Sequence, residues 1–149
     1  MSNALVVVDM LHDFIDRGLA CNEAEKAVAE TLKFIDSQTH GQGGEEHEIL
    51  DTFPILFVCD GHHIHDDLKP YAVEELTFTN VCGKSSENCS GAEAVNNAEQ
   101  TVGEILELLD TTDVHVCGMA DESCIRKTCE DLQKAGFKVH LHKDCVAYV

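Results

Sequence analysis

The fold is most clearly indicated by residues 114–145, VHVCGMADESCIRKTCEDLQKAGFKVHLHKDC. It begins with a short apolar run, Val114–Cys117, whose two valines favour a buried strand. After a polar turn, apolar residues recur at helical spacing at Ile125, Cys129 and Leu132. Gly136 is suited to end that helix in a left-handed conformation, and Lys138–His142 alternates as a second strand does. This order predicts a βαβ unit with parallel strands and a right-handed crossover.

Cys124 lies in the first helical turn after the C-terminal end of the first predicted strand. Helix N-terminal amides and the helix dipole favour an anion at that place, so the pKa of the thiol should fall and the thiolate should form. Ligands of open α/β sheets bind outside the same strand ends. The alternative is that Cys124 is a small apolar residue that fills the seam between helix and sheet, as free cysteines often do.

Two more strands are predicted from the unbroken apolar runs Ala4–Val8 and Pro54–Cys59. Such runs are typical of strands that are covered on both faces, so we expect them to lie beside Val114–Cys117 in the middle of a parallel sheet. Thr77–Val81 predicts a shorter strand. Helices are expected at two stretches with an apolar face, Asn22–Ser37 and Asn97–Leu109. The predicted fold is a three-layer αβα, Rossmann-like arrangement with a mostly parallel sheet of about five strands.

Length and composition limit the class of protein. At 149 residues, with 44% hydrophobic and 26% charged residues, residues 1–149 are expected to form one globular domain. Ten basic residues against 28 acidic ones give a formal net charge of −18, which argues against nucleic acid as a partner. No apolar run approaches the ~20 residues of a membrane span, and no leader pattern is evident, so a cytoplasmic protein without a membrane partner is expected.

The eight cysteines do not resemble a disulfide framework. They include no CxxC pair, and Cys59 and Cys117 lie inside predicted strands. Free thiols in a reducing compartment therefore fit the pattern better than disulfides or a structural zinc cluster.

Two predicted strands end in an aspartate, and a third leads to Cys124, so polar side chains should meet at one edge of the sheet. Asp9 and Cys124 would make an acid/base and nucleophile pair, because a nearby carboxylate can take the proton of a thiol. Lys84 follows a predicted strand at the same edge and would hold both anionic forms. The alternative for Lys84 is a solvated surface lysine.

A second group follows the strand Pro54–Cys59, where the sequence reads DGHHIHDD. Asp60 and His62 are separated by one residue, so both side chains can turn toward one point, and His65 or His63 could supply a third ligand. Carboxylate and imidazole are ligands that suit zinc, and a catalytic ion keeps one open position. The alternative is a solvated loop of histidines and aspartates.

Several segments together resemble the isochorismatase-like cysteine hydrolases, a superfamily that includes nicotinamidase, N-carbamoylsarcosine amidohydrolase and isochorismatase. They are ALVVVDMLHDF, FVCDGH, CGMADESCIRKTCEDLQKAGFKV and KDCVA, and they follow the family's order over most of the chain. The resemblance implies a catalytic triad of Asp9, Lys84 and Cys124. The assignment of Lys84 depends on SGAEAVNNAEQTVGEILELL, which looks like the segment after the family's lysine. The resemblance also implies a cis peptide at Met119–Ala120, with the amides of Ala120 and Cys124 forming the oxyanion hole.

The sequence departs from the family pattern in three places. The segment that carries a further metal histidine in nicotinamidases is contracted, with Tyr71 near the expected place. Asp121 stands where the family usually has threonine, and the family's final strand and helix are absent before Val149. A sheet edge left open in this way predicts self-association, because unpaired edge strands tend to find partners.

The resemblance implies a hydrolase that cleaves the C–N bond of a small amide, as nicotinamidase does, through a thioester on Cys124. The family pattern also implies a divalent metal, zinc, bound by Asp60, His62 and His65. The substrate would be a small molecule, and a homo-oligomer is expected. Two alternatives stay open: an isochorismatase-type hydrolase, and a catalytically inactive family member that binds a small molecule.

Overall fold

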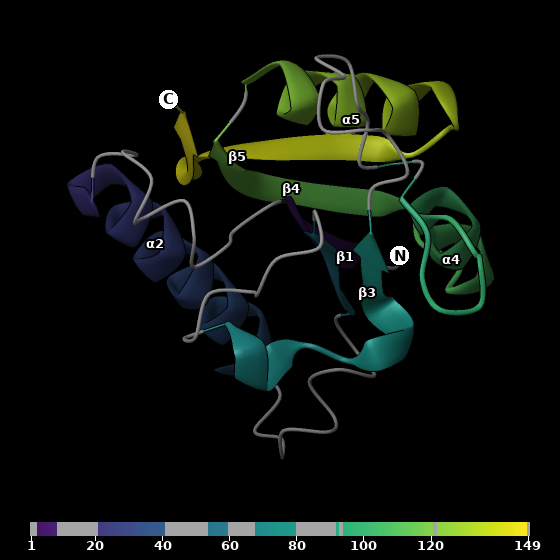
Figure 1. The fold of residues 1–149 in the computed structure, drawn as a ribbon, viewed down its shortest axis with the longest axis horizontal. Coiled ribbons are helices and arrows are strands. Elements are labelled where there is room, and N and C mark those ends of the chain that lie inside the picture. Colours follow the sequence, from purple (N-terminus) through teal and green to yellow (C-terminus); the bar gives the residue numbers. More distant parts are fainter. Residues whose placement is uncertain are drawn as a thin grey trace.

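The computed structural model describes residues 3–8, 21–40, 54–59, 68–79, 92, 94–120 and 122–148 (Figure 1). The strands are β1 (Asn3–Val8), β2 (Ile55–Cys59), β3 (Thr77–Thr79), β4 (Asp113–Ala120) and β5 (Lys138–Tyr148). The helices are α2 (Cys21–His40), α4 (Val102–Leu108) and α5 (Glu122–Lys134), with short 3-10 turns η1 (Lys69–Tyr71) and η2 (Glu74–Leu76).

The five strands form one sheet in the order β3-β2-β1-β4-β5, and every neighbouring pair runs parallel. The three long apolar runs are therefore the adjacent central strands β2, β1 and β4, as the sequence predicts. Parallel strands need crossover connections, which place helices on the faces of the sheet. The predicted α/β architecture is confirmed.

Alternate residues of each central strand enter two different cores, because successive side chains of a strand point to opposite faces. In β1, Leu5 and Val7 pack with Ala27, Val28 and Ile35 of α2. Val6 and Val8 pack on the other face with residues of α4 and α5. Figure 1 shows the same division, with α2 on one side of the sheet and α4 and α5 on the other. The sheet is thus the middle of three layers.

Helix α5 packs on β4 and β5 through the apolar face that the sequence predicts. Ile125 and Leu132 are fully buried, with Thr128 between them, while Cys129 is only half-buried. The helix is followed by Gly136 with a φ of 102°, a left-handed conformation that glycine adopts without steric cost. The apolar face of α5 and the glycine that follows the helix are therefore as the sequence predicts.

The start of α4 differs from the prediction, because the helix begins at Val102 rather than at Asn97. The side chain of Asn96 accepts hydrogen bonds from the backbone amides of Ala98 and Gln100, which holds 96–100 in a turn. Thr101 then caps the helix in a reciprocal capping box with Glu104. A side-chain-to-backbone bond competes with the helix here, and the apolar spacing alone does not reveal it.

Strands β4 and β5 extend beyond the predicted Val114–Cys117 and Lys138–His142. In β5 the pairing with β4 shifts, from Val116 opposite Leu141 to Gly118 opposite Val146. Residues 142–145 therefore stand opposite the single residue Cys117, as an irregularity of the edge strand. Such an insertion bends a strand and re-aims its side chains, and Cys145 is buried against α2 at this point.

Candidate functional site

The carboxyl ends of β2, β1 and β4 lie side by side. Val8, the last residue of β1, pairs with Val58 of β2 on one side and with Gly118 of β4 on the other. Helix α5 begins at Glu122, two residues after the end of β4. Ligand sites of parallel α/β sheets lie outside this edge, so the backbone has the framework that such a site requires.

Gly118 allows β4 to approach β1 closely at this edge. A Cβ at this position would lie 2.3 Å from the backbone oxygen of Val8 and 2.9 Å from its Cβ. Real side chains do not reach such distances, so any other residue would force the two strands apart. The glycine thus sets the spacing of two of the three central strands just before they end.

The predicted site residues stand as follows. Cys124 is the third residue of α5, and Ala120 is the last residue of β4. Asp9 follows directly on the last residue of β1 in the sequence, and Asp60 follows directly on the last residue of β2. Asp9 and Asp60 themselves, with Lys84, His62, His63 and His65, lie outside the described residues. Their roles therefore stay predictions.

Three cysteines elsewhere in the sheet and α5 are poor candidates for the nucleophile. Burial is the largest effect on each, and it raises the pKa of the thiols of Cys117 and Cys145. It also raises the pKa of Cys129 to about 11, with the Glu130 carboxylate adding to the effect. The thiolate is the reactive form, so these thiols should react slowly near neutral pH.

The predicted ligands of the expected metal centre lie between 60 and 65, outside the described residues. Among the described residues, no group of three or more His, Cys, Asp or Glu side chains is arranged to hold a metal ion. Tyr71, which stands near the family's further metal histidine, belongs to η1 and packs against the core that contains Cys59. In this chain the aromatic side chain of Tyr71, partly buried against the core, therefore stands near the position where nicotinamidases have the further metal histidine.

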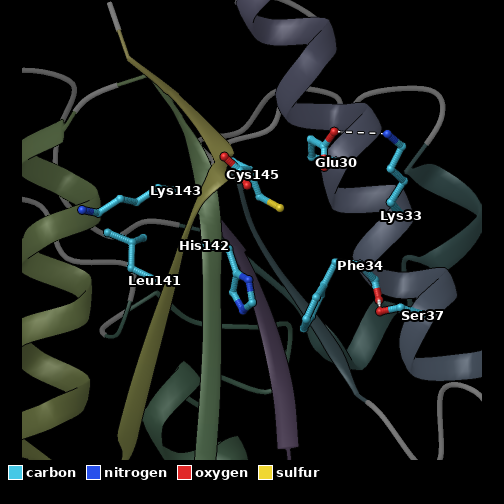
Figure 2. A pocket seen from close by; sticks show the side chains of 9 residues that line it. Glu30, Lys33, Phe34, Ser37, Leu141, His142, Lys143 and Cys145 are labelled. Atoms are coloured by element: carbon cyan, nitrogen blue, oxygen red, sulfur yellow. Dashed lines mark hydrogen bonds and ion pairs between the residues drawn. The ribbon is translucent and has the colours of Figure 1, made fainter.

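A groove of about 480 Å³ lies on the other side of the molecule from α5, between α2 and β5. Figure 2 shows Phe34 of α2 facing His142 of β5 across it, while the sulfur of Cys145 points toward α2. Leu141 and Lys143 alternate with these residues and point away from α2. No pattern in the sequence predicts this groove.

Next to the groove is a polar cluster that the sequence prediction also missed. His115 Nδ1 lies 2.8 Å from His142 Nε2, and His115 Nε2 lies 3.1 Å from Asn3 Oδ1. His140 Nε2 lies 2.9 Å from Asp113 Oδ1, in an ion pair when the ring is protonated. The spacings DVH (113–115) and HLH (140–142) place these side chains on one face of each strand. Only the pairing of β4 with β5 brings the two sets together.

Comparison with known proteins gives a consistent result. The model of the isochorismatase domain matches residues 3–149. The "Uncharacterized isochorismatase family protein PncA" of Bacillus subtilis is 23% identical over 175 residues, covering 99% of this chain and 87% of that protein. Below about a quarter of identical residues, such a likeness supports the fold more strongly than any detail of the site.

Two solved structures extend the comparison. The pyrazinamidase of Pyrococcus horikoshii, determined in complex with zinc, superposes with a TM-score of 0.69 at 24% identity, covering 100% of this chain and 88% of that one. The nicotinamidase SaPncA of Staphylococcus aureus gives a TM-score of 0.66 at 15% identity, covering 99% of this chain and 83% of that one.

In the described part of the chain, no helix is long and apolar enough to cross a membrane.

Proposed function

Because this chain belongs to the isochorismatase family, a family of hydrolases, we propose that it hydrolyses a small amide with Cys124 as the nucleophile. The similar structures named above are a pyrazinamidase and a nicotinamidase, so an aromatic carboxamide is the substrate class to test first. The overall reaction would be amide plus water giving a carboxylate and ammonia.

In the proposed mechanism, Asp9 takes the proton of Cys124 and the thiolate attacks the carbonyl carbon of the amide. The oxyanion that forms is held by the backbone amides of Ala120 and Cys124, and Lys84 stabilises the anionic groups around it. Asp9 passes the proton to the leaving nitrogen, ammonia departs, and a thioester remains. Water, activated by Asp9, then hydrolyses the thioester and restores the thiol.

The observation that supports this proposal most directly is the backbone arrangement of β1, β4 and α5. Val8 of β1 pairs with Gly118 of β4, so the segments that follow β1 and β4 leave the sheet from the ends of adjacent strands. Cys124 is in the first turn of α5, where unpaired helix amides favour a thiolate. The raised pKa values of Cys117, Cys129 and Cys145 leave these three thiols unsuited to the role.

Asp60, His62 and His65 would hold a divalent metal, with zinc fitting a set of one carboxylate and two imidazoles. Asp60 directly follows the last residue of β2, which neighbours β1, the strand that leads to Asp9, so a metal held there would be at the same edge of the sheet as the proposed acid/base. The ion would polarise the substrate and help to orient it.

A reducing compartment such as the cytoplasm fits this chemistry. The structure describes the side chains of four cysteines, and none of them forms a disulfide: Cys59, Cys117, Cys129 and Cys145. A thiol nucleophile needs the same conditions, because oxidation would remove the thiolate.

The proposed activity can be tested by measuring ammonia release from nicotinamide, pyrazinamide and a panel of aliphatic amides. The parent protein should hydrolyse at least one aromatic carboxamide, and Cys124→Ala should abolish the turnover. Cys129→Ala is the matched control, since this thiol lies on the same helix and is half-buried, and the variant should keep its activity. If Cys124→Ala retains the parent rate, the nucleophile is wrong. If no amide is hydrolysed while nicotinamide still binds, the chain is an inactive binding member of the family.

A further inference from the structure

The contact between His115 and His142 has a defined proton requirement. The side-chain oxygen of Asn3 can only accept, so His115 donates to it from Nε2. In the neutral ring, Nδ1 of His115 then carries a lone pair and accepts a hydrogen bond from Nε2 of His142. The two imidazoles therefore connect β4 to β5 through one shared hydrogen bond, and β4 to β1 through Asn3.

While the hydrogen bond between them is intact, His115 and His142 can take up one proton together but not two. If His115 gains a proton, its Nδ1 donates, and His142 can accept at Nε2 by carrying its own hydrogen on Nδ1. If both rings are protonated, two N–H groups face each other at a nitrogen separation of 2.8 Å, with no acceptor between them. The hydrogen bond must then break, and two like charges lie side by side.

On balance, the surroundings of His115 and His142 disfavour protonation of the two rings. Burial, with the neighbouring His142 and His140, lowers the pKa of His115 to about 4, and Asp113 opposes this only in part. Burial and His140 likewise lower the pKa of His142, against the opposing effect of Asp144. Glu30 and Lys33 of α2 line the same groove but are paired with each other, 3.2 Å apart. Lys143 of β5 borders the same groove, but its side chain points away from α2 (Figure 2).

Helix α2 is attached to this pair through Phe34. The centre of its ring lies 5.1 Å from the ring of His115 and 4.4 Å from that of His142, tilted against both. In Figure 2 the ring of Phe34 faces His142 directly. An imidazolium is attracted to an aromatic face, which offsets part of the cost of the first proton. The second proton separates the two histidines and removes the surface on which Phe34 packs.

We propose that His115 and His142 form a pH-sensitive latch, which holds α2 on β4 and β5 while one ring is neutral and releases it when both rings are protonated. The sign follows from linkage, since a histidine whose pKa is lowered by folding stabilises the fold above that pKa. The contribution is complete above the unfolded value of about 6.5 and is lost as the pH falls toward 4. Release of α2 would uncover Ala27, Val28 and Ile35 of the helix, and with them the sheet face that carries Leu5 and Val7.

The test compares the parent chain with His142→Gln between pH 8 and pH 3.5. Glutamine can donate to His115 from its amide nitrogen, and it can rotate to accept through its oxygen when His115 is protonated, but it never gains a charge. Because the chain contains no tryptophan, Phe34→Trp in each background gives a single fluorescence signal from this contact. Hydrogen exchange of α2 peptides, corrected for the intrinsic pH dependence and measured with Phe34 intact, gives the same information if the tryptophan variant does not fold. His47→Gln removes a histidine of the polar segment 39–51 and serves as the control.

In the parent, α2 should lose protection at a higher pH than β1 and β4 do. In the parent background that carries Phe34→Trp, the tryptophan emission should shift to the red at the same higher pH. His142→Gln should move the release of α2 to lower pH by about one unit, while His47→Gln should leave the midpoint unchanged. The proposal is overturned if α2 and the central strands lose protection together at one pH. It is also overturned if His142→Gln releases α2 at the parent midpoint.

Discussion

Gly118 of β4 lies so close to Val8 of β1 that a Cβ on the glycine would be 2.3 Å from the Val8 oxygen. This contact joins two central strands one residue before the position of Asp9 and six residues before Cys124. The separation of the proposed acid/base and nucleophile therefore depends on a residue that has no chemical function of its own.

Gly118→Ala should destabilise the fold, because the added methyl meets backbone atoms that cannot move without displacing a strand. Overpacking of this kind costs about 2 kcal/mol or more in the free energy of unfolding, which urea denaturation would measure. Gly103→Ala is the matched control, since the nearest neighbour of its Cβ would be 3.9 Å away and alanine favours the helix by about 1 kcal/mol. Equal stability of the two variants would contradict the role given to Gly118.

Cys124 should be the first cysteine to react with a limiting amount of iodoacetamide near neutral pH, as peptide mapping would show. Lys84→Met should slow that reaction at least about tenfold, since the loss of a neighbouring cation raises the pKa of the thiol. Lys127→Met is the control, because this lysine lies one turn along the same helix and pairs with Asp131 at 3.4 Å. Faster labelling of another cysteine, or an unchanged rate in Lys84→Met, would exclude the proposed triad at that residue.

Protein purified without a chelator or an affinity tag should contain close to one zinc ion per chain by elemental analysis. Asp60→Ala should lose the metal, because the site would keep only imidazole ligands. Asp131→Ala removes a partly exposed carboxylate of α5 and should keep the metal. A metal-free parent after incubation with zinc would mean that the histidines after β2 do not form a metal site.

The chain should self-associate through β5, which together with β3 forms the edges of the sheet among the described strands and carries the exposed Leu141. Light scattering at micromolar concentration should give at least twice the mass of one chain, and Leu141→Lys should reduce it to a monomer. Leu108→Lys changes a more exposed leucine on α4 and should leave the assembly intact. A monomeric parent protein would rule out this prediction.

The central sheet was predictable because three strands consist of apolar residues covered on both faces. The start of α4 was not, because Asn96 holds a turn through its side chain where the spacing of apolar residues favours a helix. The full length of β5 was missed for a related reason. Lys143 and Asp144 look like the end of a strand, yet they belong to an irregular part of an edge strand that continues to Tyr148.

The candidate site divides in the same way. The positions of Cys124 and Ala120 at the junction of β4 and α5 follow from the order of elements that the sequence predicts. The contact of His115 with His142 was not predictable, because it joins residues 27 apart in the sequence and depends on the exact register of two strands. The alternation of residues indicates that His115 shares a face of its strand with Asp113, and His142 with His140. It does not indicate which side chain of the other strand each one contacts.

The order of the strands also constrains how the chain can fold as it is synthesised. β1 leaves the ribosome before β2 and β4 but lies between them in the sheet, and Asp113, which pairs with Asn3 of β1, follows it by more than a hundred residues. Of its two described neighbours, β1 can pair with β2 alone until β4 has emerged, and one edge of a highly apolar strand stays open. Long-range parallel pairing is slow and exposes the chain to aggregation, so a chaperone that shields Ala4–Val8 during translation should raise the yield of folded protein.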